Sequence, residues 1–428
     1  MDRTDAVRFA ERHNMYYEQL DFAGLRDSFL SEMLLGLQGP GSSIGMFPSY
    51  LRPSGSPRLN ESVLVIDAGG TNLRVARVHF DGSGQIVTEA VTRQRMPGTD
   101  GYDISAEEFF RGIAETVLPL SEGCESGAFC FSYPCEVLPD RDGRVIRLTK
   151  ELHVPELPGM LVCAELSAAM RRAGAQRDIH WITLNDTVGS MLGGMAECDR
   201  SRYDDYVGFI LGTGTNTCCS VPAKMITKSS AAMAQGGDII VNLESGGFDK
   251  LLTGDADDIL DAASVTPGSQ REEKMISGAY LAELLRVTLS LAASDGLLSA
   301  ETGRALRSRT ADIMDVDALT RGRFDSGLPA ALREDEREFA AGVNELLLRR
   351  AAKITAATFA AIVRLRELPS GSRVLVCADG TTFKKNLLLR PCTEEYLAAE
   401  LLRPQNIAVD FIHVSDSTLL GTAYAALI

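Results

Sequence analysis

Two short segments with the same pattern constrain the fold of this chain more than any other feature. In the first, four apolar residues at 63–66 run into Asp67, a turn follows at 69–72, and alternating apolar residues continue to Phe80. This pattern predicts two antiparallel strands joined by a glycine turn. Glycine lets a ligand approach the main chain closely, and exposed amides together with the Thr71 hydroxyl suit phosphate oxygens. A polar hairpin turn that carries an acid by chance is the alternative.

The second segment, at 207–222, repeats this plan. An apolar strand meets a turn that contains Gly212, Thr213 and Gly214, and a second apolar strand follows the turn. Two hairpins of one design in one chain indicate an internal duplication. Two such hairpins facing each other across a cleft are typical of the actin-like ATPase architecture. The repeat therefore favours phosphate binding over a chance turn.

Composition narrows the class of protein. A length of 428 residues favours two domains. A formal net charge of −15 repels nucleic acid and anionic membranes, so neither is an expected partner. No apolar run is long enough to span a bilayer. The nine cysteines are an odd number without a CxxC pair, a pattern that suits reduced core thiols in the cytoplasm.

Strands alternate with helices in both halves of the sequence, which predicts an α/β fold. Helices are expected over 1–37, from 271 to beyond 291, and over 338–368, while 253–270 are expected to form an acidic loop. Residues 144–149 alternate like a strand. These elements set the positions of the polar residues considered next.

Several carboxylates stand beside small residues at the expected ends of strands or starts of helices. Asp67, Asp186 and Glu244 follow strands, and Glu273 lies just inside a helix. Asp186 follows Asn185 and precedes a helix whose positive end would stabilise a carboxylate. A plain helix N-cap is the more common explanation of a strand–Asn–Asp–helix pattern. Cap and catalytic base are compatible, because a capping aspartate can still direct one oxygen into a cleft.

Other polar residues suit a carbohydrate or a nucleotide. Amides such as Asn216, with the carboxylates above, suit sugar hydroxyls because each hydroxyl both donates and accepts a hydrogen bond. Lys150, which follows Thr149, could hold a phosphate or a hydroxyl, although a solvated surface lysine is more common. Gly380 and Thr381 repeat the glycine-plus-hydroxyl theme after a strand. Neither a GxxxxGK[ST] loop nor a GxGxxG turn after a strand is present.

Taken in order, these residues resemble the eukaryotic-type hexokinase family from about residue 20 to the end of the chain. The segments that carry the resemblance are DAGGTNLR at 67–74, FSYP at 131–134, TK at 149–150, NDTVG at 185–189, GTGTN at 212–216, NLE at 242–244, EKMISG at 273–278 and DGTTFK at 379–384. Any one of these segments is a modest match, whereas eight in the family's order are specific.

The resemblance implies ATP-dependent phosphorylation of a hexose at its 6-hydroxyl. It implies that Asp186 is the general base and that Lys150 assists it. The implied sugar-binding residues are Ser132, Thr149, Lys150, Asn185, Asp186, Asn216, Glu244 and Glu273. The implied nucleotide-binding residues are Asp67, Gly69, Gly70, Thr71, Asn72, Arg74, Gly212, Thr213, Gly214, Gly380 and Thr381. Asp67 and Asp186 would contact Mg²⁺, through water.

The implied fold is a two-domain actin-like ATPase (ribonuclease H-like) fold with a cleft between a small and a large domain. The expected small domain is 61–187 plus 416–428, and the expected large domain is 1–60 plus 188–415. The expected partners are a hexose and ATP, with the chain a monomer or a homodimer.

Two departures from the family's pattern leave the preferred hexose open: Ser245 and Leu148 stand where the family has tryptophan. A catalytically silent sugar-binding homologue is the alternative function. A kinase of the bacterial repressor/ORF/kinase group is disfavoured, because its cysteine-rich zinc motif is absent.

Overall fold

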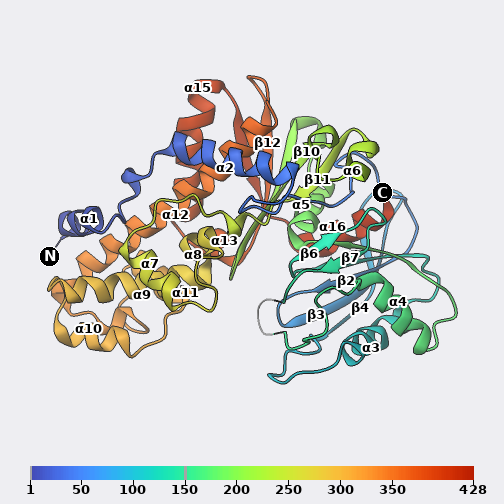
Figure 1. Cartoon of the computed structure of the whole chain (residues 1–428), viewed down its shortest axis with the longest axis horizontal. Coiled ribbons are helices and arrows are strands. Elements are labelled where there is room, and N and C mark those ends of the chain that lie inside the picture. The colour runs from blue at the N-terminus through green and yellow to red at the C-terminus, as the bar shows by residue number, and fades with distance from the viewer. Residues whose placement is uncertain (1, 149–151) are drawn as a thin grey trace.

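The computed structural model describes residues 2–148 and 152–428. Two mixed sheets organise them: a five-stranded sheet in the order β4-β3-β2-β5-β8 and a six-stranded sheet in the order β1-β11-β10-β9-β12-β13. Figure 1 shows the first sheet at the lower right and the second at the upper centre. Within the described residues, no helix is long and apolar enough to cross a lipid bilayer.

The five-stranded sheet is built around β2. Its strands are β2 (Val63–Ala68), β3 (Asn72–Phe80), β4 (Ile86–Arg95), β5 (Ser126–Phe131) and β8 (His180–Leu184). Side chains alternate across β2. Leu64 and Ile66 pack in one core with α3 (Ala106–Val117) and α4 (Val162–Arg172), whereas Val63 and Val65 pack in another core with α16 (Ser417–Leu427). Both faces of β2 are therefore covered, which is why 63–66 is continuously apolar.

The six-stranded sheet repeats the topology of the first. Its strands are β1 (Phe47–Pro48), β9 (Asp205–Leu211), β10 (Thr215–Pro222), β11 (Asp238–Asn242), β12 (Arg373–Asp379) and β13 (Ala408–Ile412). In each sheet an antiparallel hairpin, β2–β3 or β9–β10, is extended on one side by two parallel strands and on the other by an antiparallel strand. In the six-stranded sheet β1 adds one more antiparallel strand beyond β11. Both predicted hairpins are confirmed, and the shared order supports the predicted duplication. A separate small sheet pairs β6 (Cys135–Val137) with β7 (Gly143–Val145).

The helix α12 (Arg337–Leu365) confirms the helix predicted over 338–368. Most of the remaining helices lie around it. The others are α1 (Arg3–Arg12), α2 (Phe22–Gln38), α6 (Ser230–Gln235), α7 (Asp255–Ala263), α8 (Arg271–Ile276), α9 (Gly278–Ser294), α10 (Ala300–Arg307), α11 (Ile313–Thr320), α13 (Thr381–Lys385), α14 (Leu389–Leu397) and α15 (Arg403–Gln405). α12 packs against α1, α2, α8, α9 and α14, so it forms the centre of the largest apolar core.

The prediction of one helix over 1–37 was wrong, because two helices form with a break between them. Asn14 adopts a left-handed conformation with φ 54°, which a continuing helix cannot include. Asp21 then caps α2 by accepting hydrogen bonds from the amides of Ala23 and Gly24. The apolar period runs through this break, so periodicity alone does not locate it.

The helix predicted from 271 to beyond 291 is also interrupted. Ser277 is extended, with φ −78° and ψ 156°, and separates α8 from α9. The interruption lets the amide of Gly278 donate to the carbonyl of Gly212 in the second hairpin turn, at 2.8 Å. The helix break therefore coincides with a long-range contact that is absent from the local pattern.

Two further local predictions were wrong. The stretch 253–270 contains α7, whose first turn carries three aspartates that favour the positive end of a helix, and whose Leu260 is buried. The strand predicted over 144–149 ends at Val145, because β7 pairs with only the three residues of β6, after which the amide of Ile146 donates to the carbonyl of Pro134.

α5 (Asp186–Glu197) and α16 cross between the two sheets. α5 packs on β9 and β12 of one sheet, and α16 packs on β2 and β5 of the other (Figure 1). At the crossing the two backbones touch: a Cβ atom on Gly421 would clash with the carbonyl of Gly189, and one on Gly193 would clash with that of Ser417. The sheets are thus connected through a glycine-lined helix pair. The domain boundaries expected from the sequence stay a prediction.

Replacing Gly421 with alanine should destabilise the protein by about 1–3 kcal/mol, because the added methyl group meets backbone that cannot rotate away. Urea unfolding followed by circular dichroism measures this change. Gly82→Ala is the matched control, since a Cβ there meets nothing within 4 Å. Equal stability of the two variants would contradict the close crossing of α5 and α16.

Candidate functional site

The first hairpin turn, between β2 and β3, is held by short-range bonds and by one aromatic residue. The amide of Gly69 donates to the carbonyl of Asn72 at 3.0 Å. The hydroxyl of Tyr133 lies 3.3 Å from the carbonyl of Gly69 and 3.2 Å from that of Gly70. Burial raises the pKa of Tyr133 to about 12, so the hydroxyl remains a donor at neutral pH. Thr71 is exposed at the tip of the turn.

The second hairpin turn, between β9 and β10, is joined to two other segments. The carbonyl of Gly212 accepts from the amide of Gly278 at 2.8 Å and from the hydroxyl of Thr382 at 3.1 Å. Gly380 has φ 104°, and a Cβ atom there would clash with the carbonyl of Leu211. Two segments predicted separately to bind a nucleotide, 212–214 and 380–381, therefore adjoin, and the close approach requires glycine at 380.

The helix cap at the start of α5 is Asn185, not Asp186. The side-chain oxygen of Asn185 accepts from the amide of Thr187 at 2.9 Å and from its hydroxyl at 2.6 Å. Asp186 is the first residue of the helix. The suggestion that Asp186 is a plain N-cap was therefore wrong, because the preceding asparagine fills that role.

Asp186 lies near carboxylates from both sheets. Its charge raises the pKa of Asp67, at the end of β2, and that of Glu244, which follows β11. Burial is the larger cause of both shifts. Since like charges disfavour each other's ionised form, these three residues share one electrostatic environment.

A hydrogen-bonded polar cluster joins α5 to the six-stranded sheet. The side-chain amide of Asn216, on β10, lies 3.3 Å from the side-chain oxygen of Asn185 and 2.8 Å from that of Asn242. The amide of Asn242 donates to Glu244 at 2.8 Å. Asn242 was not among the predicted site residues, although it lies in the segment 242–244 that carries the resemblance. The structure thus brings Asn185, Asn216 and Glu244 together, with Asn242 linking Asn216 to Glu244.

Glu273 is held against the second hairpin turn. Its Oε2 accepts from the amide of Thr215 at 3.1 Å. A Cβ atom on Gly214 would lie 2.6 Å from the same oxygen, so a larger residue at 214 would displace the carboxylate. Ser245, which follows Glu244, is buried and its hydroxyl lies 3.1 Å from that of Thr217.

Asp67 is paired with Arg74 on the neighbouring strand, at 2.9 Å, and Arg74 also pairs with Asp416 just before α16. Burial raises the pKa of Asp67, and Arg74 opposes this shift. Arg74 was expected to hold a nucleotide, yet its guanidinium already has two carboxylate partners. Asp416 was not predicted from the sequence.

Asp67 and Asp186 fit a Mg²⁺ ion bound through water. Their mutual repulsion is of the kind that a divalent cation relieves, and Mg²⁺ commonly keeps several waters while using one or two protein carboxylates. Residues 2–148 and 152–428 contain no group of three or more His, Cys, Asp or Glu side chains arranged to hold a metal directly.

Two further predicted residues, Ser132 and Asn72, form hydrogen bonds close to the first hairpin turn. The amide of Ser132 donates to the carbonyl of Ala68 at the end of β2, at 3.3 Å. The side-chain amide of Asn72 lies 3.3 Å from the Thr71 hydroxyl. Thr149 and Lys150 lie outside the described residues.

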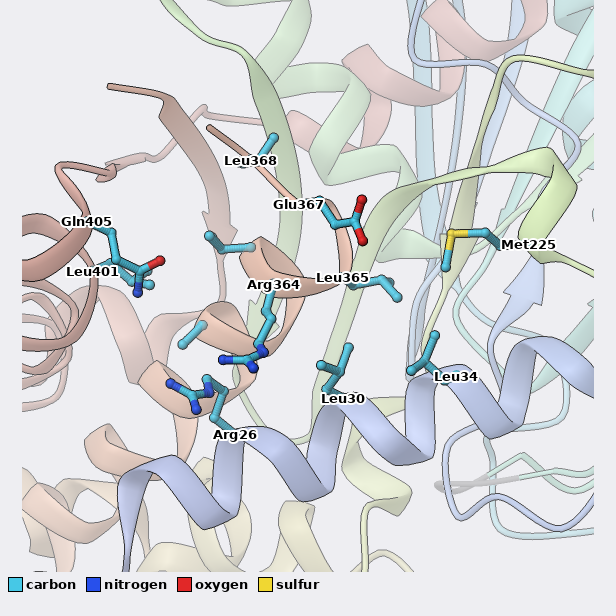
Figure 2. A pocket seen from close by; sticks show the side chains of 12 residues that line it. Arg26, Leu30, Leu34, Met225, Arg364, Leu365, Glu367, Leu368, Leu401 and Gln405 are labelled. Atoms are coloured by element: carbon cyan, nitrogen blue, oxygen red, sulfur yellow. The ribbon is translucent and has the colours of Figure 1, made fainter. Parts of the chain in front are cut away.

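A separate cavity of about 440 Å³ lies between α2, the end of α12 and α15. Figure 2 shows Arg26, Leu30 and Leu34 along α2, with Arg364 and Gln405 on the other walls. None of the predicted site residues that the structure describes lines this cavity. It is therefore distinct from the polar cluster around Asn216.

The sequence matches two family models, both described as hexokinase, over residues 8–196 and 206–428. Hexokinase-3 of Mus musculus is 31% identical over 428 residues, which cover 91% of this chain and 44% of the mouse protein. The chain therefore spans less than half the length of that relative. The chloroplastic hexokinase-4 of Oryza sativa subsp. japonica is 31% identical over 442 residues, which cover 94% of this chain and 84% of the rice protein.

A solved structure described as hexokinase from Schistosoma mansoni complexed with glucose has a TM-score of 0.78 at 23% identity, with 100% of both chains covered. At this level of identity the likeness concerns the fold. It confirms the predicted two-domain actin-like ATPase fold.

Replacing Asn242 with alanine should lower the free energy of unfolding by about 1–3 kcal/mol, because Asn216 and Glu244 would both lose a hydrogen-bond partner at 2.8 Å. Thermal and urea unfolding measure the loss. Gln94→Ala, which removes an exposed amide from β4, is the control and should change stability by less than about 0.5 kcal/mol. If Asn242→Ala left the free energy of unfolding unchanged, the polar cluster would contribute little to stability.

Proposed function

This chain belongs to the hexokinase family, and we propose that it transfers the terminal phosphoryl group of ATP to the 6-hydroxyl of a hexose, with Asp186 as the general base. The observation that carries the proposal is the placement of Asp186 at the start of α5, directly beside the hydrogen-bonded cluster of Asn185, Asn216 and Glu244. A sugar bound by that cluster would have a hydroxyl within reach of the Asp186 carboxylate.

The sugar side of the proposed site combines amides with carboxylates. Asn185 and Asn216 can both donate and accept, while Glu244 and Glu273 accept, so together they match hydroxyls that do both. Burial raises the pKa of Glu244, and the hydrogen bond from Asn242 opposes that shift. A bound sugar hydroxyl would add a donor and further stabilise the ionised form. Ser132, Thr149 and Lys150 complete the proposed set.

The phosphate side of the proposed site is the pair of glycine turns. Amides and hydroxyls at 69–72, 212–214 and 380–381 would hold the phosphates, and the adjoining of 212–214 and 380–381 supports that grouping. Mg²⁺, held through water by Asp67 and Asp186, would neutralise phosphate charge. Arg74 would act by orienting Asp67, to which it is bonded.

The proposed phosphoryl transfer then depends on the position of the 6-hydroxyl relative to the phosphorus and on the exclusion of water. Asp186 would accept the proton of the 6-hydroxyl as its oxygen attacks the phosphorus in line with the leaving group. Closure of one sheet towards the other, about the glycine-lined crossing of α5 and α16, would expel water that could otherwise accept the phosphoryl group.

The preferred hexose is the open part of the proposal. Ser245 is small and buried beside Glu244, where the family pattern has tryptophan. The pocket is accordingly expected to accept a different range of sugars from a tryptophan-bearing one, and a panel of glucose, fructose, mannose, glucosamine and N-acetylglucosamine tests that range.

Asp186→Asn and Asp186→Ala should lower kcat by about 10²–10⁴-fold on every sugar that the wild type phosphorylates, because a general base is lost. ADP release measures turnover, and calorimetry with sugar alone measures binding, which should persist in Asp186→Asn. Asp178→Asn, at an exposed site, is the control and should behave as wild type. If the wild type binds sugars and phosphorylates none of them, the chain is a silent sugar-binding homologue instead.

A further inference from the structure

Glu272, next to the proposed sugar ligand Glu273, is a buried acid to which the proposed chemistry gives no role. Only 1% of its surface is exposed. Its Oε1 accepts from the hydroxyl of Thr358 on α12, at 3.0 Å, whereas its Oε2 has no hydrogen-bond partner among residues 2–148 and 152–428. An ionised carboxylate left with one donor in an apolar environment is strongly unfavourable, but a neutral acid tolerates it.

No positive charge near α8 acts to stabilise an ionised Glu272 among the residues that the structure describes. Several charged groups on α8 and on the helices packed against it form ion pairs: Arg271 and Lys274 with Asp261, Arg350 with Asp257, and Glu283 with Arg286. The 3₁₀ turn Ser245–Gly247 that also packs on α8 carries no charge. Among residues 2–148 and 152–428, the charge that acts on Glu272 is the like charge of Glu273.

Burial raises the pKa of Glu272 to about 8, with the charge of Glu273 adding to the shift and the hydrogen bond from Thr358 opposing it. At neutral pH the side chain is therefore protonated. The sequence contains two adjacent glutamates, but the structure makes one a neutral acid that faces α12 and leaves the other to face Thr215.

Both glutamates are fixed by the same short helix. The amide of Glu272 donates to the carbonyl of Phe248 at 3.0 Å, and its side chain contacts α12, so Glu272 anchors the back of α8. Glu273 leaves the same turn towards the second hairpin. A change that loosens the anchor would move the sugar-facing carboxylate.

We propose that Glu272 is a positioning residue, held as an uncharged acid behind Glu273, and that its ionisation at alkaline pH weakens binding of the sugar. This inference rests on the proposed function, because it takes Glu273 as a sugar ligand. Ionisation places a second negative charge beside Glu273 in a site of low dielectric, and it makes the unpaired Oε2 costly to keep buried. Both effects push the first turn of α8 away from α12.

The test is the pH dependence of the sugar KM from about pH 6 to about pH 10. Wild-type KM should be constant below pH 8 and then rise by up to about ten-fold per pH unit, because only the protonated form binds well. In Glu272→Gln, which is isosteric and permanently neutral, KM should stay flat, with kcat near that of wild type at neutral pH. A rise that persists in Glu272→Gln would overturn the proposal.

Two control variants test whether the alkaline rise in KM arises from Glu272 and not from another group. Glu301→Gln changes an exposed glutamate in the first turn of α10 and should keep the alkaline rise in KM. Burial also lowers the pKa of Lys228 to about 8, so Lys228→Met tests a second group that titrates in this range. The rise should survive in Lys228→Met as well, and its loss there would assign the titration to the lysine and refute the proposal.

Stability provides a measurement that does not depend on turnover. The folded-state pKa of Glu272 is raised from an ordinary value of 4.5 to about 8, so between these values the unfolded chain releases a proton that the folded chain keeps. Stability therefore falls as pH rises through that window. The Tm of Glu272→Gln should exceed that of wild type by more at pH 8 than at pH 5, and a constant difference would show that Glu272 is ionised when folded.

The two measurements also separate this inference from the proposed function. If no sugar is phosphorylated, the proposed function fails, and the Tm comparison together with calorimetric sugar binding at different pH values still decides the state and the role of Glu272. If sugars are phosphorylated while wild-type KM stays flat to pH 9, the positioning role fails and the proposed function stands.

Discussion

The interaction on which the proposed site most depends is the cap that Asn185 forms on α5. One side-chain oxygen accepts from the amide and the hydroxyl of Thr187 and also lies 3.3 Å from the side-chain amide of Asn216, on β10 of the six-stranded sheet. The cap determines the residue at which the helix starts, and thereby places Asp186 on its first turn. Because the Asn185 side chain also contacts Asn216 on β10, it fixes the position of the helix start relative to the polar cluster. A shift of this cap by one residue would rotate Asp186 by about 100° around the helix axis.

The helix pair behind this cap determines how the two sheets are joined. α5 and α16 approach so closely that backbone meets backbone at Gly189, Gly193 and Gly421. Larger side chains would interdigitate and favour one fixed arrangement. A backbone contact lined with glycines presents a smoother surface, which suits a joint about which two sheets can turn. The same contact leaves little room for substitution, so the proposed closure and the expected intolerance to mutation would arise from one feature.

How far the sequence predicts this structure depends on the range of the interactions involved. The hairpins at β2–β3 and β9–β10 were predictable, because apolar strands and glycine turns are local patterns. The break at Ser277 was not, since it coincides with a long-range hydrogen bond from Gly278 to the carbonyl of Gly212. Asp186 was mistaken for a cap because Asn and Asp cap helices equally well. Asn242 and the neutral state of Glu272 depend on burial, which no short segment reveals. Thr149 and Lys150 lie outside the described residues, so their roles stay predictions.

The proposed site collects more negative charge than its hydrogen bonds satisfy. Burial raises the pKa of Asp67 and of Glu244, and the neighbouring charge of Asp186 adds to both shifts. Such a cluster lowers the stability of the folded chain near neutral pH, because carboxyl groups ionise more easily in the unfolded state. A sugar that donates hydrogen bonds and a cation that accompanies phosphates would each relieve part of that repulsion. The repulsion between these carboxyl groups would therefore favour ligands that bring hydrogen-bond donors or positive charge to the proposed site.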